Sequence, residues 1–460
     1  MRPKLHTFQA FADTLLPLEI EYLLGIQRFE DPERVAILHQ LAEHARQPMA
    51  FSEHIDKRKY SHVKKWIQEH LNAADVDHQF AWLSRMETAV YTDSIDAASE
   101  KQLLKCFEQA GPDWFHFQKL YLLARSMRHY LLIRMRTESV QAVEHFLDQN
   151  REAFGRAEAV SEELYRLTKC LSDPNAASGA PLWSTWLEQV FYDETLDGHN
   201  RILAFVRLIF FAYSQRRYAL LPDKLDYMER AFAAGRLYAR RILTNYYSQR
   251  LLYHAHKQEF EQAAAYGYLS LRNANADRLY YANNLAGVLL RLRRGEDALQ
   301  VLRSAAPDAK RSTAFHNKIG HAAYLIGAFN LLGKYQQAET HAEVLLRAYR
   351  KEMLEHRRHL FFANYWEALL CGRKAARLLK SNHTAQVLER DSVRASNPNY
   401  LPTLPWLWTL AAYQEGKLGR AECTQTVRAF LERFADQPLP AAIQHLQELT
   451  LRLVPEVMAG

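Results

Sequence analysis

Histidine is the residue type that most readily supplies metal ligands and acid–base groups, and the 460-residue chain contains 20 histidines. His356 and His359, in the sequence HRRH, are three positions apart and would share one face of a helix. Two ligands do not complete a metal site, and Arg357 and Arg358 between them would repel a cation. We therefore interpret this segment as a solvent-exposed basic helix and expect no metal.

Motifs of the common enzyme classes are missing, because the sequence contains no HExxH, GxSxG or GxGxxG. Gly327–Tyr335 (GAFNLLGKY) comes close to a phosphate loop, but Tyr335 stands where Ser or Thr would bind magnesium. We expect a helix that ends at Gly333 instead. No catalytic residue and no cofactor is predicted; a site assembled from distant residues of the N-terminal region is the alternative.

The cysteines indicate a reducing compartment. The four residues are far apart in the sequence and form no CxxC pair: Cys106, Cys170, Cys371 and Cys423. A disulfide scaffold or a zinc ribbon needs denser or paired cysteines. We expect reduced thiols in a cytoplasmic protein.

No segment has the features of a signal peptide or a membrane span. Asp13, Glu19 and Glu21 interrupt the apolar core that a signal peptide would need. Ile202–Tyr213 is strongly apolar, but it contains Arg207 and is shorter than the ~20 residues that cross a bilayer. We expect a soluble protein in which this segment is a buried helix.

Apolar residues recur at helical spacing through most of the chain. The clearest stripe lies in Gln118–Met135, and similar patterns occur in Asp77–Tyr91, Ser139–Phe154 and Glu162–Leu171. Only 16 glycines and 15 prolines occur, too few for a fold with many tight turns. The predicted fold class is all-α.

Two segments rich in Pro, Ser and Asn, Ser172–Pro181 and Ser396–Pro405, predict breaks between helices. We place the main boundary at the first of them. The predicted organisation is an N-terminal helical region, residues 1–171, followed by a helical repeat region, residues 182–460.

Three segments of the second region resemble one another: Tyr247–Arg272, Asn283–Ala306 and Ala322–Leu346. Each reads as a helix, a short turn and a second helix, and a small residue lies just inside the second helix: Ala263, Ala298 and Ala338. The spacings of 35 and 40 residues are near the 34-residue tetratricopeptide period. An irregular helical bundle with alanines spaced by chance is the alternative.

In this part, roughly residues 245–346, the sequence resembles tetratricopeptide (TPR) repeats. The matching positions are Leu285, Ala286, Leu289, Ala298, Leu302 and Ala305 in the second unit, Leu325, Phe329, Gly333, Tyr335 and Ala338 in the third, and Phe260 and Ala263 in the first. The family's tryptophan and proline are absent, and Arg250 stands where the family prefers Leu. The resemblance implies a TPR-like α-solenoid of helical hairpins, the first helices of which line a groove that binds peptides or proteins.

The resemblance also implies which residues face that groove. They are Asn245, Ser248 and Gln249 in the first unit, Tyr280, Asn283 and Asn284 in the second, and Tyr324 and Asn330 in the third. Some members bind a chaperone's C-terminal carboxylate with a Lys/Asn clamp, which this chain does not reproduce because Gly287 replaces the Asn.

Charge is unevenly distributed. The net charge is +7, but residues 1–230 carry 28 Lys and Arg against 33 Asp and Glu, whereas residues 231–460 carry 31 against 19. Ala231–Arg250 includes Arg241 and Arg250 and no acidic residue, with Tyr238, Tyr246 and Tyr247 between the arginines. This pattern suggests a basic groove for an acidic peptide or a nucleic acid. The alternatives are a solvated outer face with its aromatics in the core, or a surface on which the acidic half docks.

Together these patterns predict a non-catalytic scaffold that binds a protein or peptide, possibly acidic, partner in the groove of a helical repeat array. The alternative is a protein that binds nucleic acid or another acidic ligand through its basic half.

Overall fold

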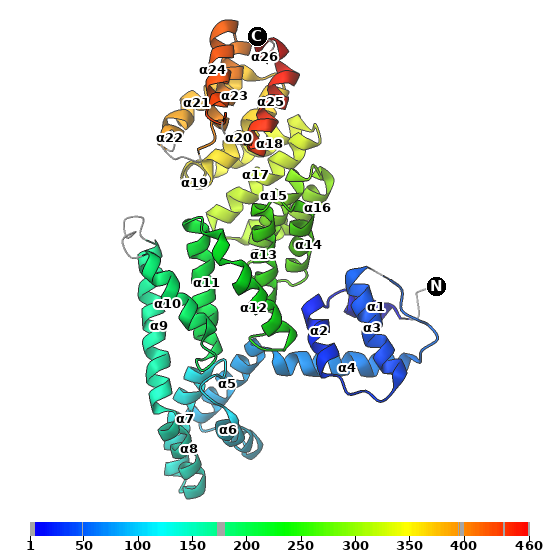
Figure 1. Cartoon of the computed structure of the whole chain (residues 1–460), viewed down its shortest axis with the longest axis vertical. Helices are drawn as coiled ribbons and strands as arrows, with labels where there is room; N and C mark the ends of the chain where they lie inside the picture. Colours follow the sequence, from blue (N-terminus) through cyan, green and yellow to red (C-terminus); the bar gives the residue numbers. More distant parts are fainter. Residues whose placement is uncertain are drawn as a thin grey trace. The chain divides into compact units, whose positions relative to one another are not determined.

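The computed structural model of the chain describes residues 5–47, 49–172, 180–393, 395, 400–435 and 438–458. Every regular element in these residues is a helix, which confirms the all-α fold class (Figure 1). The chain divides into two compact units, residues 1–246 and 247–460. Of the predicted boundary segment, residues 173–179 lie outside the described residues, so regions 1–171 and 182–460 stay a prediction.

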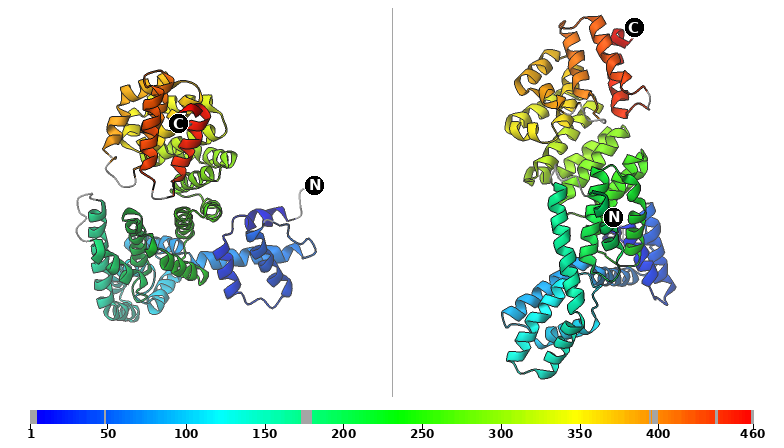
Figure 2. Two further views of the ribbon diagram at one scale, coloured as in Figure 1. Left: turned by 45° about the horizontal axis from the view of Figure 1, so that its top comes forward. Right: turned by 60° about the vertical axis from the view of Figure 1, so that its left-hand side comes forward.

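Unit 1 contains α1 (His6–Ala12), α2 (Pro17–Ile26), α3 (Pro32–Arg46), α4 (Lys57–Ala74), α5 (Val76–Tyr91), α6 (Ala97–Gln109), α7 (Phe117–Ile133), α8 (Thr137–Gln149), α9 (Arg151–Ser172), α10 (Ala180–Tyr192), α11 (Gly198–Ser214), a 3₁₀ turn (Tyr218–Leu220), α12 (Pro222–Ala233) and the start of α13 (Arg240–His256). Helices α1 to α4 enclose an apolar core of their own, which includes Phe8, Leu23 and Leu38. Both views of Figure 2 show these four helices together.

Helix α11 contains the strongly apolar segment Ile202–Tyr213. It buries Phe205 and Leu208 but leaves Val206 and Phe210 about half exposed, so the predicted buried helix is buried on one face only. Among the described helices, none combines the length and the apolar character needed to cross a membrane.

Unit 2 contains the rest of α13 and α14 (Phe260–Ser270), α15 (Arg278–Arg291), α16 (Gly295–Arg311), α17 (Phe315–Leu331), α18 (Tyr335–Ala348), α19 (Arg350–Glu355), α20 (Arg358–Cys371), α21 (Ala375–Ala385), α22 (Val387–Ser392), α23 (Thr403–Gln414), α24 (Arg420–Glu432), α25 (Ala441–Leu453) and α26 (Pro455–Met458). The pairs α15–α16, α17–α18, α20–α21 and α23–α24 are hairpins in which each helix contacts its partner. The first helices α15, α17, α20 and α23 also contact one another in that order.

One kind of connection recurs between paired helices. Three residues join α13 to α14, α15 to α16, α17 to α18 and α20 to α21, and the middle residue has a left-handed backbone each time: Gln258, Arg293, Gly333 and Arg373. The next backbone N–H then donates to a carbonyl in the last turn of the first helix, as from Lys334 to Phe329 O (2.8 Å) and from Lys374 to Leu369 O (2.8 Å). This is the hydrogen-bonding pattern of the Schellman motif, which ends a helix and reverses the chain.

A second recurring contact joins neighbouring hairpins. The residue after the left-handed position is a cation that pairs with an acid on the second helix of the preceding hairpin: Arg294 with Glu261, Lys334 with Glu296, and Lys374 with Glu339. In unit 1, Arg136 in the α7–α8 connection pairs with Glu100 on α6 in the same way. The residue after the left-handed position therefore forms the same kind of ion pair with an earlier helix in both units.

The three alanines identified from the sequence are fully buried. Ala263, Ala298 and Ala338 each have an exposed fraction of 0%, inside α14, α16 and α18. Each lies in the first turn or so of the second helix, where a larger side chain would force the paired helices apart.

We predict that Ala298→Leu lowers the free energy of unfolding by about 1–3 kcal/mol, because overpacking a closely packed core forces backbone shifts. Ala306→Leu is the matched control, since Ala306 is exposed on the same helix, α16. Denaturant unfolding followed by circular dichroism measures both. Equal stability of the two variants would contradict close packing at Ala298.

Candidate binding surface

The structure divides the predicted site residues into three groups. Four are buried: Gln249, Arg250, Asn283 and Asn330. Four are half-buried: Asn245, Tyr280, Asn284 and Tyr324. Arg241 is exposed and lies in unit 1.

Asn283 and Asn330 hold neighbouring first helices together. The Nδ2 of Asn283 on α15 donates to the carbonyl of Asn317 on α17 (2.9 Å), and the Nδ2 of Asn330 on α17 donates to the carbonyl of Asn364 on α20 (2.8 Å). The two residues in each bond are 34 positions apart. Asn283 is only 1% exposed, and Asn330 is buried as well. Both asparagines therefore belong to the packing between hairpins and not to the solvent-facing groove surface on which we expected them.

The more accessible predicted residues lie together on one surface. Tyr280 and Asn284 are one helical turn apart on α15, and Gly287 continues the same face. The ring of Tyr324 from α17 lies against Gly287, where an added Cβ would come within 3.3 Å of the ring. Gly287 stands where some TPR proteins have the asparagine of their carboxylate clamp, and its lack of a side chain makes room for the ring of Tyr324. We call Tyr280, Asn284 and Tyr324 the tyrosine surface.

The arginines around the start of α13 serve unit 1 internally. Arg241 forms a two-pronged ion pair with Asp77 (3.1 and 3.0 Å), and Arg240 lies 3.3 Å from the carboxylate of Glu19. Tyr238 and Tyr246 are buried. Two of the predicted alternatives apply to this segment, because its tyrosines lie in the core and its arginines pair with acidic residues. Arg241 is therefore not free for a ligand.

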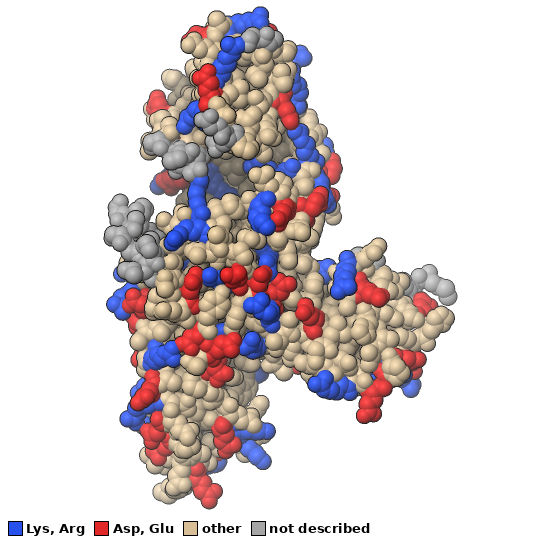
Figure 3. Space-filling view, viewed as in Figure 1, with Lys and Arg blue, Asp and Glu red and all other residues tan. Residues whose placement is uncertain are grey.

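Part of the positive charge of unit 2 is also paired internally. The unit carries 28 Lys and Arg against 19 Asp and Glu. Glu339, nearly fully buried, binds both Lys374 and Arg377, and Asp308 binds Arg278 (2.7 Å) and Arg311 (2.8 Å). Figure 3 shows cationic and anionic side chains next to one another over much of the viewed face. These ion pairs neutralise part of the basic charge of unit 2.

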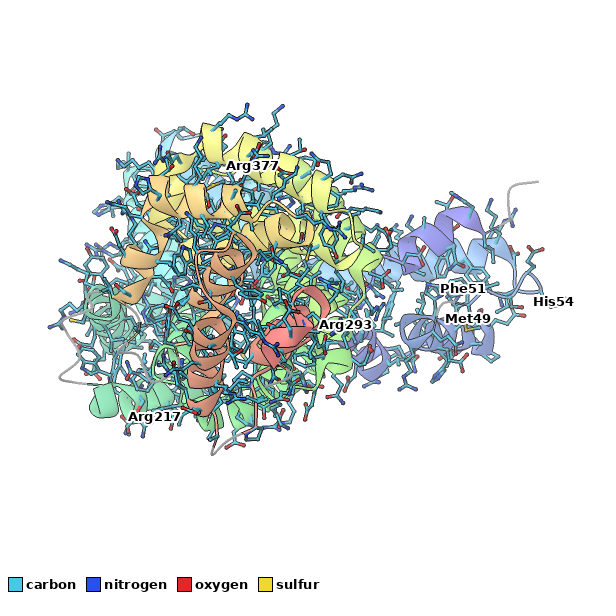
Figure 4. All side chains as sticks on the ribbon, turned by 90° about the horizontal axis from the view of Figure 1, so that it is seen from above. Met49, Phe51, His54, Arg217, Arg293 and Arg377 are labelled. Atoms are coloured by element: carbon cyan, nitrogen blue, oxygen red, sulfur yellow. The ribbon has the colours of Figure 1, made fainter. Side chains whose placement is uncertain are left out.

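Helix α25 has an apolar and a polar side. Ile443, Leu446 and Leu449 are buried in the core of unit 2. Three polar side chains, spaced three and four residues apart, contact earlier hairpins: His445 with Glu367 (3.0 Å), Glu448 with Arg293, and Arg452 with Cys371 (3.0 Å). Figure 4 labels Arg293 beside α25, and Arg377 on α21. Helix α25 thus contacts the connection after α15 and the C-terminal part of α20.

The HRRH segment spans a helix break. His356 follows α19 with an extended backbone, Arg357 is left-handed, and α20 begins at Arg358. The expectation that His356 and His359 share a helix face is therefore wrong. Instead, His359 Nδ1 lies 3.1 Å from the buried carboxylate of Asp391.

Five carboxylates of the described residues are buried and were not anticipated: Glu19, Glu100, Asp197, Glu339 and Asp391. Glu19 accepts from the hydroxyl of Tyr238 (2.7 Å) and the backbone N–H of Leu16 (2.8 Å), and burial raises its pKa. Asp391 accepts from the hydroxyl of Tyr400 (2.6 Å). No signal in the sequence identifies them, since the partner of Glu19 is 219 positions away.

The structure offers no ready metal or thiolate centre among the residues it describes. No group of three His, Cys, Asp or Glu side chains there is placed to hold a metal ion. All four cysteines are free, and burial raises the pKa of Cys106, Cys371 and Cys423 to about 11, which keeps these thiols protonated near neutral pH.

We predict that Asn283→Ala lowers the free energy of unfolding by about 1–3 kcal/mol, because it removes the hydrogen bond that joins α15 to α17 and truncates a buried side chain. The neighbouring Asn284→Ala is the control and should change stability by less than about 0.5 kcal/mol, since Asn284 is half exposed. Urea unfolding measures both. A larger loss for Asn284→Ala would overturn the assignment of Asn283 to the packing.

The contact between His445 and Glu367 predicts a pH dependence. The hydrogen bond to Glu367 raises the pKa of His445 above its usual 6.5. A raised histidine pKa stabilises the fold fully below the unfolded-state value, and the contribution disappears as pH rises through the folded-state value. Hence His445→Gln should lower the melting temperature more near pH 5.5 than near pH 9.

The control for this pH dependence is His383→Gln, because His383 is exposed on α21. It should lower the melting temperature by the same small amount at both pH values. A loss for His445→Gln that does not change with pH would contradict the ion pair.

Comparison with known proteins does not assign a family or a function to the chain. No family model, curated protein or solved structure matches the chain. The interpretation of the hairpins therefore depends on their own geometry: the left-handed connections, the inter-hairpin ion pairs and the asparagine bonds between first helices.

Proposed function

We propose that unit 2 is a TPR-like array of helical hairpins that binds a peptide or protein partner and has no catalytic role of its own. The recurrence of one hairpin geometry supports the array: four three-residue connections with a left-handed centre, and first helices that contact one another in sequence. Arrays of this kind stack into a curved solenoid, because each hairpin buries only part of its apolar surface alone.

The tyrosine surface is the observation that carries the binding proposal. Tyrosine rings present apolar area and a polar tip at low entropic cost, a property that suits recognition surfaces. Tyr280, Asn284 and Tyr324 come from adjacent first helices, and Gly287 allows the two helices to share this surface. A peptide that lies across the first helices would meet aromatic faces and amide groups.

Nucleic-acid binding is the less favoured alternative. Binding to a phosphate backbone needs many cations arranged along one path. In unit 2, cations such as Lys334, Lys374 and Arg278 are engaged with carboxylates of the same unit.

The four free thiols agree with a reducing compartment, and we place the protein in the cytoplasm.

A random peptide library displayed on phage and selected on the full-length protein tests the proposal. We predict that selected peptides lose affinity at least about tenfold on Tyr280→Ala/Tyr324→Ala, because each aromatic truncation removes a contact that typically contributes more than 1 kcal/mol. The measurement is fluorescence anisotropy with the labelled peptide.

The matched control is Tyr268→Ala, since Tyr268 is partly exposed on the second helix α14. It should leave affinity within about twofold of the wild type. Selection that yields no peptide, or peptides that bind the double variant and the wild type equally, would contradict the proposed surface.

A further inference from the structure

A group of cationic and aromatic side chains surrounds the N-terminal parts of α17 and α20. His316 and Lys318 belong to α17, and His356 and Arg357 precede α20. His316 is exposed and the other three are half-buried. We call these four residues the Arg357 cluster.

Arg357 is held across α17 by specific contacts. Its Nε donates to the Nε2 of His316 (2.7 Å), and its side chain lies over Gly320, where an added Cβ would come within 3.3–3.4 Å of it. Its backbone is left-handed, with φ of 46°, a costly conformation for a residue with a side chain, and one that tends to occur at functional positions. The two Nη groups of the guanidinium remain available for a ligand.

Lys318 and His356 lie against aromatic rings. The Nζ of Lys318 lies 5.4 Å from the ring centre of Phe315 and 5.2 Å from that of Tyr349. The imidazole of His356 is parallel to Phe315, with an interplanar angle of 4°. These contacts fix positive charge in place without neutralising it.

No carboxylate in the described residues forms an ion pair with a member of the Arg357 cluster, although Glu352 and Glu355 are on the adjacent helix α19. The Nε2 of His316 accepts the Arg357 hydrogen bond and therefore carries no proton in this contact; partial burial, and after it the neighbouring charges of Arg357 and His356, lower the pKa of His316. Arg357 and Lys318 thus keep positive charge that no carboxylate of the described residues neutralises.

The Arg357 cluster continues the tyrosine surface. His316, Gly320 and Tyr324 are spaced by four residues on α17 and so lie on one face of that helix. Eight residues of helix separate His316 from Tyr324 by roughly 12 Å. An extended peptide covers that distance in about four residues.

We infer that the Arg357 cluster binds a carboxylate of the partner peptide, an Asp or Glu side chain about four residues from the segment on the tyrosine surface. This inference builds on the proposed function and specifies the partner's chemistry. Arginine suits a carboxylate because its two Nη groups can donate to both oxygens. A compact cluster fits one or two carboxylates, whereas a nucleic acid would need cations along a longer path.

The test uses fluorescein-labelled octaglutamate, with octaglutamine as the uncharged counterpart, and fluorescence anisotropy on the full-length protein at about 0.15 M salt. We expect octaglutamate to bind and octaglutamine not to bind. Arg357→Gln should weaken octaglutamate binding at least about tenfold. Gly320→Ala should weaken it by several fold without removing a charge, because its Cβ displaces the Arg357 side chain.

Arg303→Gln is the matched control, since Arg303 is exposed on α16 and forms no ion pair in the described part of the chain. It should change the affinity less than about twofold. Melting curves identify any variant that fails to fold, and Arg357→Lys, which keeps the charge but not the fork, should retain part of the binding.

Three results would overturn the inference: no octaglutamate binding to the wild type, equal loss in Arg357→Gln and Arg303→Gln, or tighter Arg357-dependent binding of a single-stranded RNA of about twelve nucleotides. Failure of this inference and failure of the proposed function give different results. Library peptides that need Tyr324 but ignore Arg357→Gln would reject the carboxylate site alone, and Arg357-dependent octaglutamate binding without Tyr324-dependent peptides would reject the tyrosine surface alone.

Discussion

The three-residue connection with a left-handed centre is the constraint on which unit 2 depends. It ends one helix, reverses the chain and starts the next helix within three residues, so the angle between paired helices is fixed by the backbone. Because Gln258, Arg293, Gly333 and Arg373 repeat it, successive hairpins have the same local geometry. After Arg293, Gly333 and Arg373 the next residue is a cation, and it pairs with an acid of the preceding hairpin.

Close packing of first helices follows from that repetition. The hydrogen bonds from Asn283 and Asn330 to backbone carbonyls satisfy polar groups where two helices meet, and Gly287, Gly320 and Gly327 allow side chains of the next helix to approach. The same contacts place Tyr324 and Arg357 across neighbouring helices. Packing and the proposed recognition surface therefore use adjacent positions of the same helices.

Sequence reasoning identified the helical pairs and the buried alanines between them. Ala263, Ala298 and Ala338 could be recognised because a small residue in a repeated pattern marks close helix packing. Asn283 and Asn284 show where this reasoning ends. Successive residues are rotated by about 100° around a helix. Asn283 therefore faces the next hairpin, whereas the half-buried Asn284 donates to Ser248 of the preceding one (3.4 Å), and a shift of one position in the alignment exchanges them.

Contacts between distant residues were beyond the sequence. Glu19 looked only like an interruption of an apolar segment, yet it is buried against Tyr238. Arg357 looked like part of a basic helix, but a helix break turns it onto Gly320. In both cases the deciding partner lies in another helix, and helical periodicity carries no information about it.

The central claim is that a partner binds across the first helices of the hairpins. Hydrogen–deuterium exchange of the full-length protein, with and without a selected peptide at saturation, tests it most directly. The account predicts slower exchange in α15, in α17 and at the start of α20, with α16, α18 and α21 unchanged. Protection confined to the second helices or to unit 1 would contradict it.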